Sequence, residues 1–163
     1  MYTVMKKIAQ KIILHAKRKK ISISICESCT GGKISDALTQ IPGASKVFLG
    51  GVIAYSPTAK EKLLKIKKKK LASFKSVSLY TSYLLAASIK TQLKSGISLA
   101  ITGFLGPSGG TKKNPKGTIC IAVISNRLTI TKKIKFKSKL RIKNKTGAAR
   151  LALKLLEYTL RAY

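Results

Sequence analysis

The sequence predicts an α/β protein, a three-layer α/β/α sandwich with a mixed central sheet of about five strands. Two observations support this prediction. Helix-like and strand-like segments alternate early in the chain, and the later strand-like segments follow one another closely enough to pair locally. The chain has 163 residues, of which 45% are apolar. This length and composition suit one packed core, so we expect a single domain over 1–163.

The first part of the chain alternates between helix and strand. The expected order is helix (to about Arg18), strand (21–25), helix (31–41), strand (47–55) and helix (from Pro57). Pro42 and Gly43 end the second of these helices, and Gly50 and Gly51 mark a bend or bulge in the second strand. Proline is accepted at the first position of a helix, so Pro57 can begin the third.

The remaining elements complete the sheet and cover it. The expected order is helix (77–93), strand (97–102), strand (118–124), strand (128–136) and a final helix through 148–160. The β-branched content of 118–124 is typical of a strand. Asn126 and Arg127 can turn the chain back into 128–136, which alternates in polarity and would form a charged sheet edge.

The charge is strongly basic, with 34 Lys and Arg residues against 4 acids and a net charge of +30. Such a charge raises the possibility of nucleic-acid binding. However, the basic clusters occur throughout the sequence, at 17–20, 65–70, 112–116 and 132–145. Aromatic residues that could stack on bases are few and are not interleaved with these clusters. We therefore expect weak nonspecific binding to polyanions and no specific nucleic-acid partner.

Membrane and redox functions find little support in the sequence. Lysines interrupt the first apolar pattern, and the uncharged run 76–89 is too short to span a bilayer, so we expect a cytoplasmic protein without a membrane partner. Cys26 and Cys29 have the spacing of a redox pair, but no thioredoxin-like context follows them. No second Cys-x-x-Cys motif completes a zinc site, so no metal is expected.

Three loops follow predicted strands and carry most of the chemically active residue types, after Ile25, Tyr55 and Thr102. In open α/β sheets, ligands bind beyond the carboxyl ends of the strands. In the first loop, Ser28 or Thr30 lies where a strand leads into a helix. Either hydroxyl could cap that helix or act as a nucleophile, and the helix start supplies backbone donors for an oxyanion.

The second and third loops could supply a base and an anion site. A serine nucleophile needs a base, and the single histidine, His15, lies in the opening helix, far from these loops in the sequence. Lys60, in the stretch YSPTAK, could serve if burial and neighbouring cations keep it neutral, and Tyr55 could relay a proton. The glycine-rich segment 103–117 could approach a phosphate near Lys112 or Lys113, but it is not a Walker A loop.

Five stretches, in order, resemble the CinA C-terminal-domain family, also known as nicotinamide-nucleotide amidases: ESCTGG (27–32), YSPTAK (55–60), VS (77–78), TGFLGPSGG (102–110) and PKGTI (115–119). The resemblance implies hydrolysis of the carboxamide of nicotinamide mononucleotide to nicotinate mononucleotide and ammonia, a step of NAD salvage. It also implies Ser28 as the nucleophile, Lys60 as the general base and Tyr55 as an assisting residue, with no metal or cofactor.

The resemblance further implies that backbone donors around 30–32 stabilise the oxyanion and that the loop 103–110 lines the nucleotide site. The expected substrate-binding residues are Glu27, Thr30, Gly31, Gly32, Thr102, Gly103, Gly106, Pro107, Gly109 and Gly110. Within that set we expect Glu27 to orient its neighbours rather than to act as a base. The cysteines beside Ser28 are interpreted as small packing residues.

The sequence departs from the family pattern at three places. Leu79 replaces a usual Glu, and Leu105 replaces a smaller residue of the glycine-rich loop and could crowd the pocket. A usual Gly-Asp-Arg motif aligns with 138–140, which reads Ser-Lys-Leu, so Lys139 or the nearby Arg141 would have to replace the arginine. Two alternatives therefore stay open beside the enzyme: a catalytically degraded nucleotide-binding relative and, less favoured, a basic nucleic-acid-associated protein. Assembly into a homo-oligomer also stays open.

Overall fold

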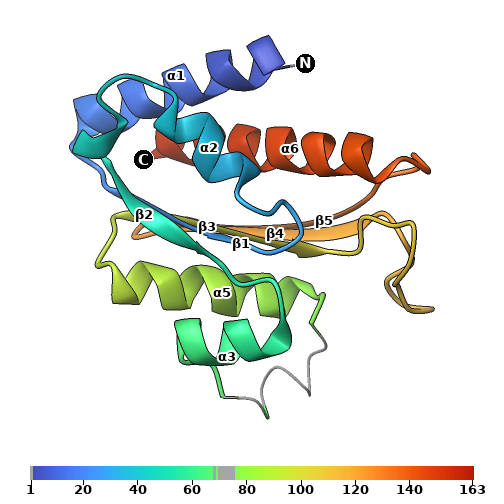
Figure 1. The fold of residues 1–163 in the computed structure, drawn as a ribbon. Coiled ribbons are helices and arrows are strands. Elements are labelled where there is room, and N and C mark those ends of the chain that lie inside the picture. The colour runs from blue at the N-terminus through green and yellow to red at the C-terminus, as the bar shows by residue number, and fades with distance from the viewer. Residues whose placement is uncertain (1, 68, 70–75) are drawn as a thin grey trace.

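A mixed sheet separates two layers of helices (Figure 1). The computed structural model describes residues 2–67, 69 and 76–163. In this part of the chain the strands are β1 Ile23–Glu27, β2 Phe48–Ile53, β3 Ile97–Gly103, β4 Thr118–Ser125 and β5 Thr129–Lys135. The helices are α1 Tyr2–Lys19, α2 Lys33–Thr39, α3 Pro57–Leu64, α5 Leu79–Gln92 and α6 Arg141–Ala162, with a short 3-10 helix at Ala44–Lys46. The predicted α/β sandwich with a five-stranded mixed sheet is confirmed.

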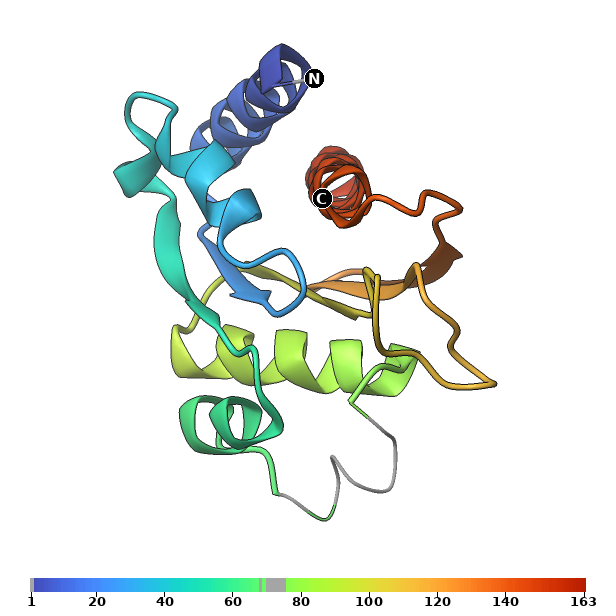
Figure 2. The ribbon, with the colours of Figure 1, turned by 45° about the vertical axis from the view of Figure 1, so that its right-hand side comes forward.

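The strand order β2-β1-β3-β4-β5 places β1 where the chain changes direction across the sheet. The chain moves from β1 to β2 on one side and later returns to β3 on the other side of β1, with all three strands parallel. β4 and β5 then add in antiparallel fashion. α2 lies on the same face as α1 and α6, whereas α3 and α5 cover the opposite face (Figures 1 and 2). Such a switch point opens a crevice at the carboxyl ends of the strands.

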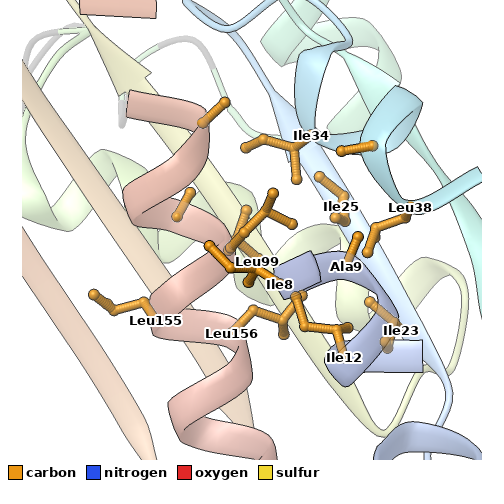
Figure 3. Close-up of a cluster of buried hydrophobic side chains, with 14 of the residues drawn as sticks. Ile8, Ala9, Ile12, Ile23, Ile25, Ile34, Leu38, Leu99, Leu155 and Leu156 are labelled. Carbon is orange, nitrogen blue, oxygen red and sulfur yellow. The ribbon is translucent and has the colours of Figure 1, made fainter. Parts of the chain in front are cut away.

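The larger core lies between the sheet and the layer of α1, α2 and α6 (Figure 3). Ile12 of α1, Ile25 of β1 and Leu156 of α6 are each fully buried there. A second core lies on the other face, where Leu85 and Ile89 of α5 pack in one cluster with residues of β1 and β4. Each fully buried Ile or Leu stabilises the fold by about 1.5–3 kcal/mol relative to an exposed one. The two cores together hold the sheet rigidly between its helical layers.

The predicted bulge in β2 is present. Ile23 pairs with Phe48 and Ser24 with Gly50, so Leu49 is the extra residue. A Cβ atom on Gly51 would collide with the backbone carbonyl of Ile25, so β1 and β2 approach each other at a position where only glycine fits. The bulge lies near the start of β2, and the strand continues to Ile53 before the loop that carries Tyr55.

The basic clusters lie on different elements. Lys17 and Lys19 end α1, 112–116 lies between β3 and β4, and 132–145 covers β5 and the start of α6. Lys68 and Lys70, which belong to the cluster 65–70, lie outside the described residues. Throughout 2–67, 69 and 76–163, no helix has both the length and the apolar character needed to cross a membrane.

Candidate active site

A cavity of about 250 Å³ lies beyond the carboxyl ends of β1 and β3. Its wall comes from segments far apart in the sequence, namely the loops after β1, β2 and β3, α3, the segment before α5, and α6. The lining residues are Ser28, Cys29, Tyr55, Pro57, Lys60, Ser76, Val77, Thr102, Gly103, Phe104, Leu105, Ser108 and Arg141. The cavity thus brings together Ser28, Tyr55, Lys60, Thr102 and Gly103 from among the residues singled out in the sequence.

Ser28 follows the last residue of β1 and is held on both sides of its peptide backbone. Its N–H donates to the carbonyl of Ile101 at 3.1 Å, and its own carbonyl accepts from the N–H of Gly31 at 3.1 Å. The residue is 5% exposed. A hydroxyl on a backbone fixed in this way is preorganised toward the cavity that it lines.

Glu27 points to the start of α2 and does not line the cavity. Its carboxylate accepts hydrogen bonds from the N–H groups of Ile34 and Ser35, at 3.1 and 2.8 Å, and from the Ser35 hydroxyl at 2.8 Å. The side chain is fully buried. A negative charge is favoured at the positive end of a helix, so Glu27 anchors α2 below the loop that carries Ser28.

The helix cap differs from the one that the sequence suggested. The N-cap of α2 is Gly32, with φ of 88°, and no side chain caps it there. Neither Ser28 nor Thr30 has the capping role, because the Glu27 carboxylate takes the helix N–H groups. Ser28 therefore does not cap α2. Thr30 is buried, and its hydroxyl has no hydrogen-bond partner among the described residues.

Lys60 lies in the first turn of α3 and turns inward. The Ser56 hydroxyl caps this helix by accepting from the N–H of Ala59 at 3.0 Å, and Pro57 begins the helix as predicted. Lys60 is 2% exposed, and its ammonium donates to the carbonyl of Tyr55 at 3.3 Å. Burial lowers the pKa of Lys60 below its ordinary value of 10.5, opposed only by the nearby thiols of Cys26 and Cys29. No carboxylate of the described residues forms an ion pair with it.

The two cysteines beside Ser28 are buried and free. Cys26 packs in the core under α5, whereas Cys29 packs in the core on the other side of the sheet. Burial raises the pKa of each thiol to about 12. The thiolate is the nucleophilic form of cysteine, so neither side chain is activated near neutral pH.

Arg141, the first residue of α6, joins two walls of the cavity. Its guanidinium donates to the Tyr55 hydroxyl at 2.9 Å and to the carbonyl of Gly106 at 2.7 Å. The sequence offered Lys139 and Arg141 as replacements for the arginine of the Gly-Asp-Arg motif. Arg141 lines this cavity, whereas Lys139 lines a neighbouring one. The sequence indicated Arg141 only through its closeness to the altered residues 138–140. No local sequence pattern shows in which direction a side chain at the start of a helix will point.

The third loop is tied to the segment before α5. Thr102 donates its hydroxyl proton to the carbonyl of Ser76 at 2.9 Å, and the Asn114 amide donates to the carbonyl of Val77 at 2.7 Å. Leu105 is 1% exposed and packs into the larger core while lining the cavity. Ser76 and Val77 are lining residues that the sequence indicated only through the motif VS (77–78).

Several predicted substrate-binding residues lie outside the lining of this cavity. Gly106 and Pro107 line the neighbouring cavity. The residues that line neither are Glu27, Thr30, Gly31, Gly32, Gly109 and Gly110. Of the backbone donors at 30–32, the N–H of Gly31 is occupied by the carbonyl of Ser28. His15 lies on α1 and does not line the cavity. The described residues contain no group of three or more His, Cys, Asp or Glu side chains placed to hold a metal ion.

Solved structures resemble this fold over nearly its whole length. The crystal structure of the competence/damage inducible protein CihA from Agrobacterium tumefaciens matches with a TM-score of 0.91 and 28% identity, covering 97% of this chain and 96% of that one. A competence-damaged protein (CinA) superfamily protein from Enterobacter cloacae matches with a TM-score of 0.89 and 29% identity, covering 96% and 92%.

Curated sequences show the same relationship. A CinA-like protein of Amoebophilus asiaticus is 42% identical over 118 residues, which cover 72% of this chain and 28% of that protein. Another CinA-like protein, of Kosmotoga olearia, is 39% identical over 134 residues, covering 82% and 32%. The chain thus spans about a third of the length of these relatives. The family model described as the CinA C-terminal domain matches residues 5–160, from the first helix to the last, and the chain belongs to that family.

Proposed function

We propose that the chain is an amidohydrolase that converts nicotinamide mononucleotide to nicotinate mononucleotide and ammonia. The observation that carries this proposal is the shared cavity of Ser28 and Lys60, in which burial lowers the pKa of the lysine. A serine hydroxyl needs a base near neutral pH, and a buried lysine can be that base when it is neutral. The family includes nicotinamide-nucleotide amidases, which supplies the substrate class.

In the first half-reaction, the Ser28 Oγ attacks the carboxamide carbon while neutral Lys60 takes the hydroxyl proton. The tetrahedral intermediate carries a negative oxygen, for which the backbone N–H groups after Ser28 are the donors nearest in the chain. When the intermediate collapses, the C–N bond breaks and Lys60 returns its proton to the departing nitrogen. Ammonia leaves, and the nicotinoyl group, still part of the nucleotide, stays bound to Ser28 as an ester.

In the second half-reaction, a water molecule attacks the ester carbon and Lys60 accepts a proton from that water. The Ser28 oxygen then leaves and regains a proton from Lys60, which restores the starting state. Tyr55 assists, because its hydroxyl oxygen accepts from Arg141 and its own proton remains available to the substrate. Cys29 lines the cavity, but its thiol is protonated near neutral pH and is disfavoured as the nucleophile.

The proposal is tested by incubating purified protein with nicotinamide mononucleotide and following both ammonia and nicotinate mononucleotide. Ser28→Ala and Lys60→Ala should each lower kcat by about 10³-fold or more, because the nucleophile and its base act as one unit. Ser45→Ala is the matched serine control, since Ser45 is exposed in the 3-10 helix and does not line the cavity. It should keep turnover in the wild-type range.

Other results of this assay would support a different nucleophile or a different function. Full activity in Ser28→Ala would move the nucleophile to Thr30 or Cys29. A wild-type protein that binds nicotinamide mononucleotide without releasing ammonia would be the degraded relative suggested by the altered residues 138–140. Against that reading, Arg141 already supplies a guanidinium to the cavity.

A further inference from the structure

A second cavity, of about 570 Å³, adjoins the one that holds Ser28. The two cavities share Leu105 as a lining residue, and Arg141 of the first donates to the carbonyl of Gly106 in the second. The lining residues of the second are Leu105, Gly106, Pro107, Lys116, Gly117, Lys135, Phe136, Lys137, Ser138, Lys139 and Asn144. The two cavities thus meet at Leu105 and Arg141, and we call the second one the lysine cavity.

The lysine cavity is cationic. Four lysines line it, and the lining contains no carboxylate. They come from three separate segments: Lys116 precedes β4, Lys135 ends β5, and Lys137 and Lys139 lie between β5 and α6. A phosphate monoester carries a charge of roughly −1.5 to −2 at neutral pH, which neutralises about half of four ammonium groups. Charge alone therefore favours an occupant with more than one phosphate group.

The start of α6 adds to this positive potential. Leu140 is its N-cap and offers no side-chain hydrogen bond, and no acidic residue lies in the first turn. The first turn carries Arg141 and Lys143 instead, so the positive end of a 22-residue helix has no negative partner there. Residues Ser138 and Lys139 before this helix and Asn144 within it line the lysine cavity.

Asn144 has one polar atom left for a ligand. It is 2% exposed, and its amide nitrogen donates to the carbonyls of Leu105 and Ser138 at 3.0 and 2.9 Å. Two carbonyl acceptors fix which end of the side chain is the nitrogen, because a carbonyl cannot donate. The Asn144 Oδ1 is buried and has no hydrogen-bond partner among the described residues. It is an acceptor, so it suits a hydroxyl group such as that of a sugar.

We propose that the lysine cavity binds the phosphate-bearing end of the substrate and prefers a diphosphate to a single phosphate. The role of this cavity in catalysis rests on the proposed function, whereas its preference among anions does not. A nicotinamide nucleotide with a diphosphate group would place the carboxamide at Ser28, its sugar near Asn144 and its phosphates among the four lysines. Such a substrate is bound more tightly than nicotinamide mononucleotide.

The test measures binding and turnover separately. Calorimetric titration of the Ser28→Ala protein with inorganic phosphate, pyrophosphate and nicotinamide adenine dinucleotide should show one site. Pyrophosphate should bind about tenfold more tightly than phosphate, and the double variant Lys135→Gln/Lys137→Gln should lose about tenfold in pyrophosphate affinity. Lys132→Gln/Lys154→Gln is the matched control, since it removes the same charge from exposed positions outside the lysine cavity. The control should keep the wild-type affinity.

Each outcome decides the inference. Equal affinities for phosphate and pyrophosphate, or equal losses in both double variants, would overturn it, because binding would then reflect only the overall charge of the chain. A pyrophosphate preference that depends on Lys135 and Lys137 supports it. If that preference holds while no nicotinamide nucleotide releases ammonia in the wild-type protein, the proposed function fails and the anion site stands.

Discussion

At the scale of single residues, the candidate site depends on the amine of Lys60, which is held out of water and forms no ion pair with a carboxylate in the part of the chain that the structure describes. Lys60 is 2% exposed, and within the described residues its ammonium donates one hydrogen bond, to the carbonyl of Tyr55. Burial of this kind penalises the charged form and lowers the pKa of the lysine. The same penalty suits Lys60 to the proposed role of base, and it also reduces the stability of the fold, as is common at active sites.

Replacing Lys60 by Met should therefore stabilise the protein at pH 7. Below its lowered pKa, Lys60 is protonated in both the folded and unfolded states, and the buried charge opposes folding in full. As pH rises from that lowered pKa toward 10.5, the folded protein loses this proton first, so the wild-type free energy of unfolding increases. We expect Lys60→Met to raise Tm by about 2–4 °C at pH 7 and by less at pH 10, measured by thermal unfolding.

Lys62→Met on the exposed side of the same helix is the control and should show no such pH-dependent gain. A Lys60→Met protein that is less stable than wild type at pH 7 would contradict the assignment of a destabilising buried amine. In the active protein, kcat/KM should fall as pH drops through the lowered pKa of Lys60. A flat profile would argue against its role as the base.

Arg141 should matter through the shape of its guanidinium as well as its charge. Arg141→Ala removes the donors to the Tyr55 hydroxyl and the Gly106 carbonyl, and kcat/KM should fall by about tenfold to a hundredfold. Arg141→Lys should recover little, because an ammonium cannot reproduce the planar fork that reaches both acceptors. Steady-state kinetics test this, with exposed Arg150→Ala on the same helix as control. Full rescue by lysine would show that charge alone is required.

At the scale of elements, α2 depends on a residue outside itself. This short helix has glycine at its N-cap, and the Glu27 carboxylate of β1 accepts the N–H groups of Ile34 and Ser35. Strand, loop and helix are thereby joined around Ser28. A substitution of Glu27 should thus lower the stability of the β1–α2 unit more than it changes contacts with the substrate.

Glu27→Gln should lower the free energy of unfolding by about 2–4 kcal/mol, because an amide offers one acceptor oxygen where the carboxylate offers two, and its NH₂ would face N–H donors. Urea denaturation measures this change. Asp36→Asn is the control on the exposed side of α2, where the carboxylate accepts from the Gln40 side chain one turn away. That variant should stay within about 0.5 kcal/mol of wild type. Equal small losses in both variants would contradict the anchoring role.

The elements were more predictable than their connections. The strands carry period-two or continuous apolar patterns because their faces are buried, as in β3 and β4, so the sequence alone indicates them. The start of α6 at Arg141 was not indicated, because its first turns are polar and only Ala148 onward shows the buried stripe. The sequence singled out Tyr55 and Lys60 by residue type and order, and Ser28 through the family resemblance, and the structure places all three around one cavity. It predicted an orienting role for Glu27 but not its partners at the start of α2, and it did not show which cavity Arg141 lines, since both depend on side-chain directions set by tertiary packing.

At the scale of the whole molecule, the net charge of +30 acts in two ways. Like charges repel one another in the folded state, and they attract polyanions without regard to sequence. On the edge strand β5, lysines also leave a charged edge that resists pairing with other strands. These effects are separate from the lysine cavity, which four of the lysines line.

Salt should therefore raise Tm and weaken binding to DNA. We expect two duplexes of unrelated sequence to bind with similar affinity at about 50 mM salt and to lose most of that affinity by about 200 mM. Fluorescence anisotropy measures the binding, and thermal unfolding over the same salt series measures the stability. A preference of more than about tenfold for one duplex would revive a specific nucleic-acid function.

The hydrogen bond between Arg141 and Tyr55 joins positions 86 residues apart, and it has a consequence for synthesis on the ribosome. Translation delivers Ser28, Tyr55 and Lys60 long before α6, whose buried leucines close the larger core over the sheet. A nascent or prematurely terminated chain that stops short of Arg141 carries the reactive side chains without the guanidinium or the covering helix. Under the proposed mechanism, chemistry at Ser28 therefore requires a docked α6, and we expect incomplete translation products to be inert.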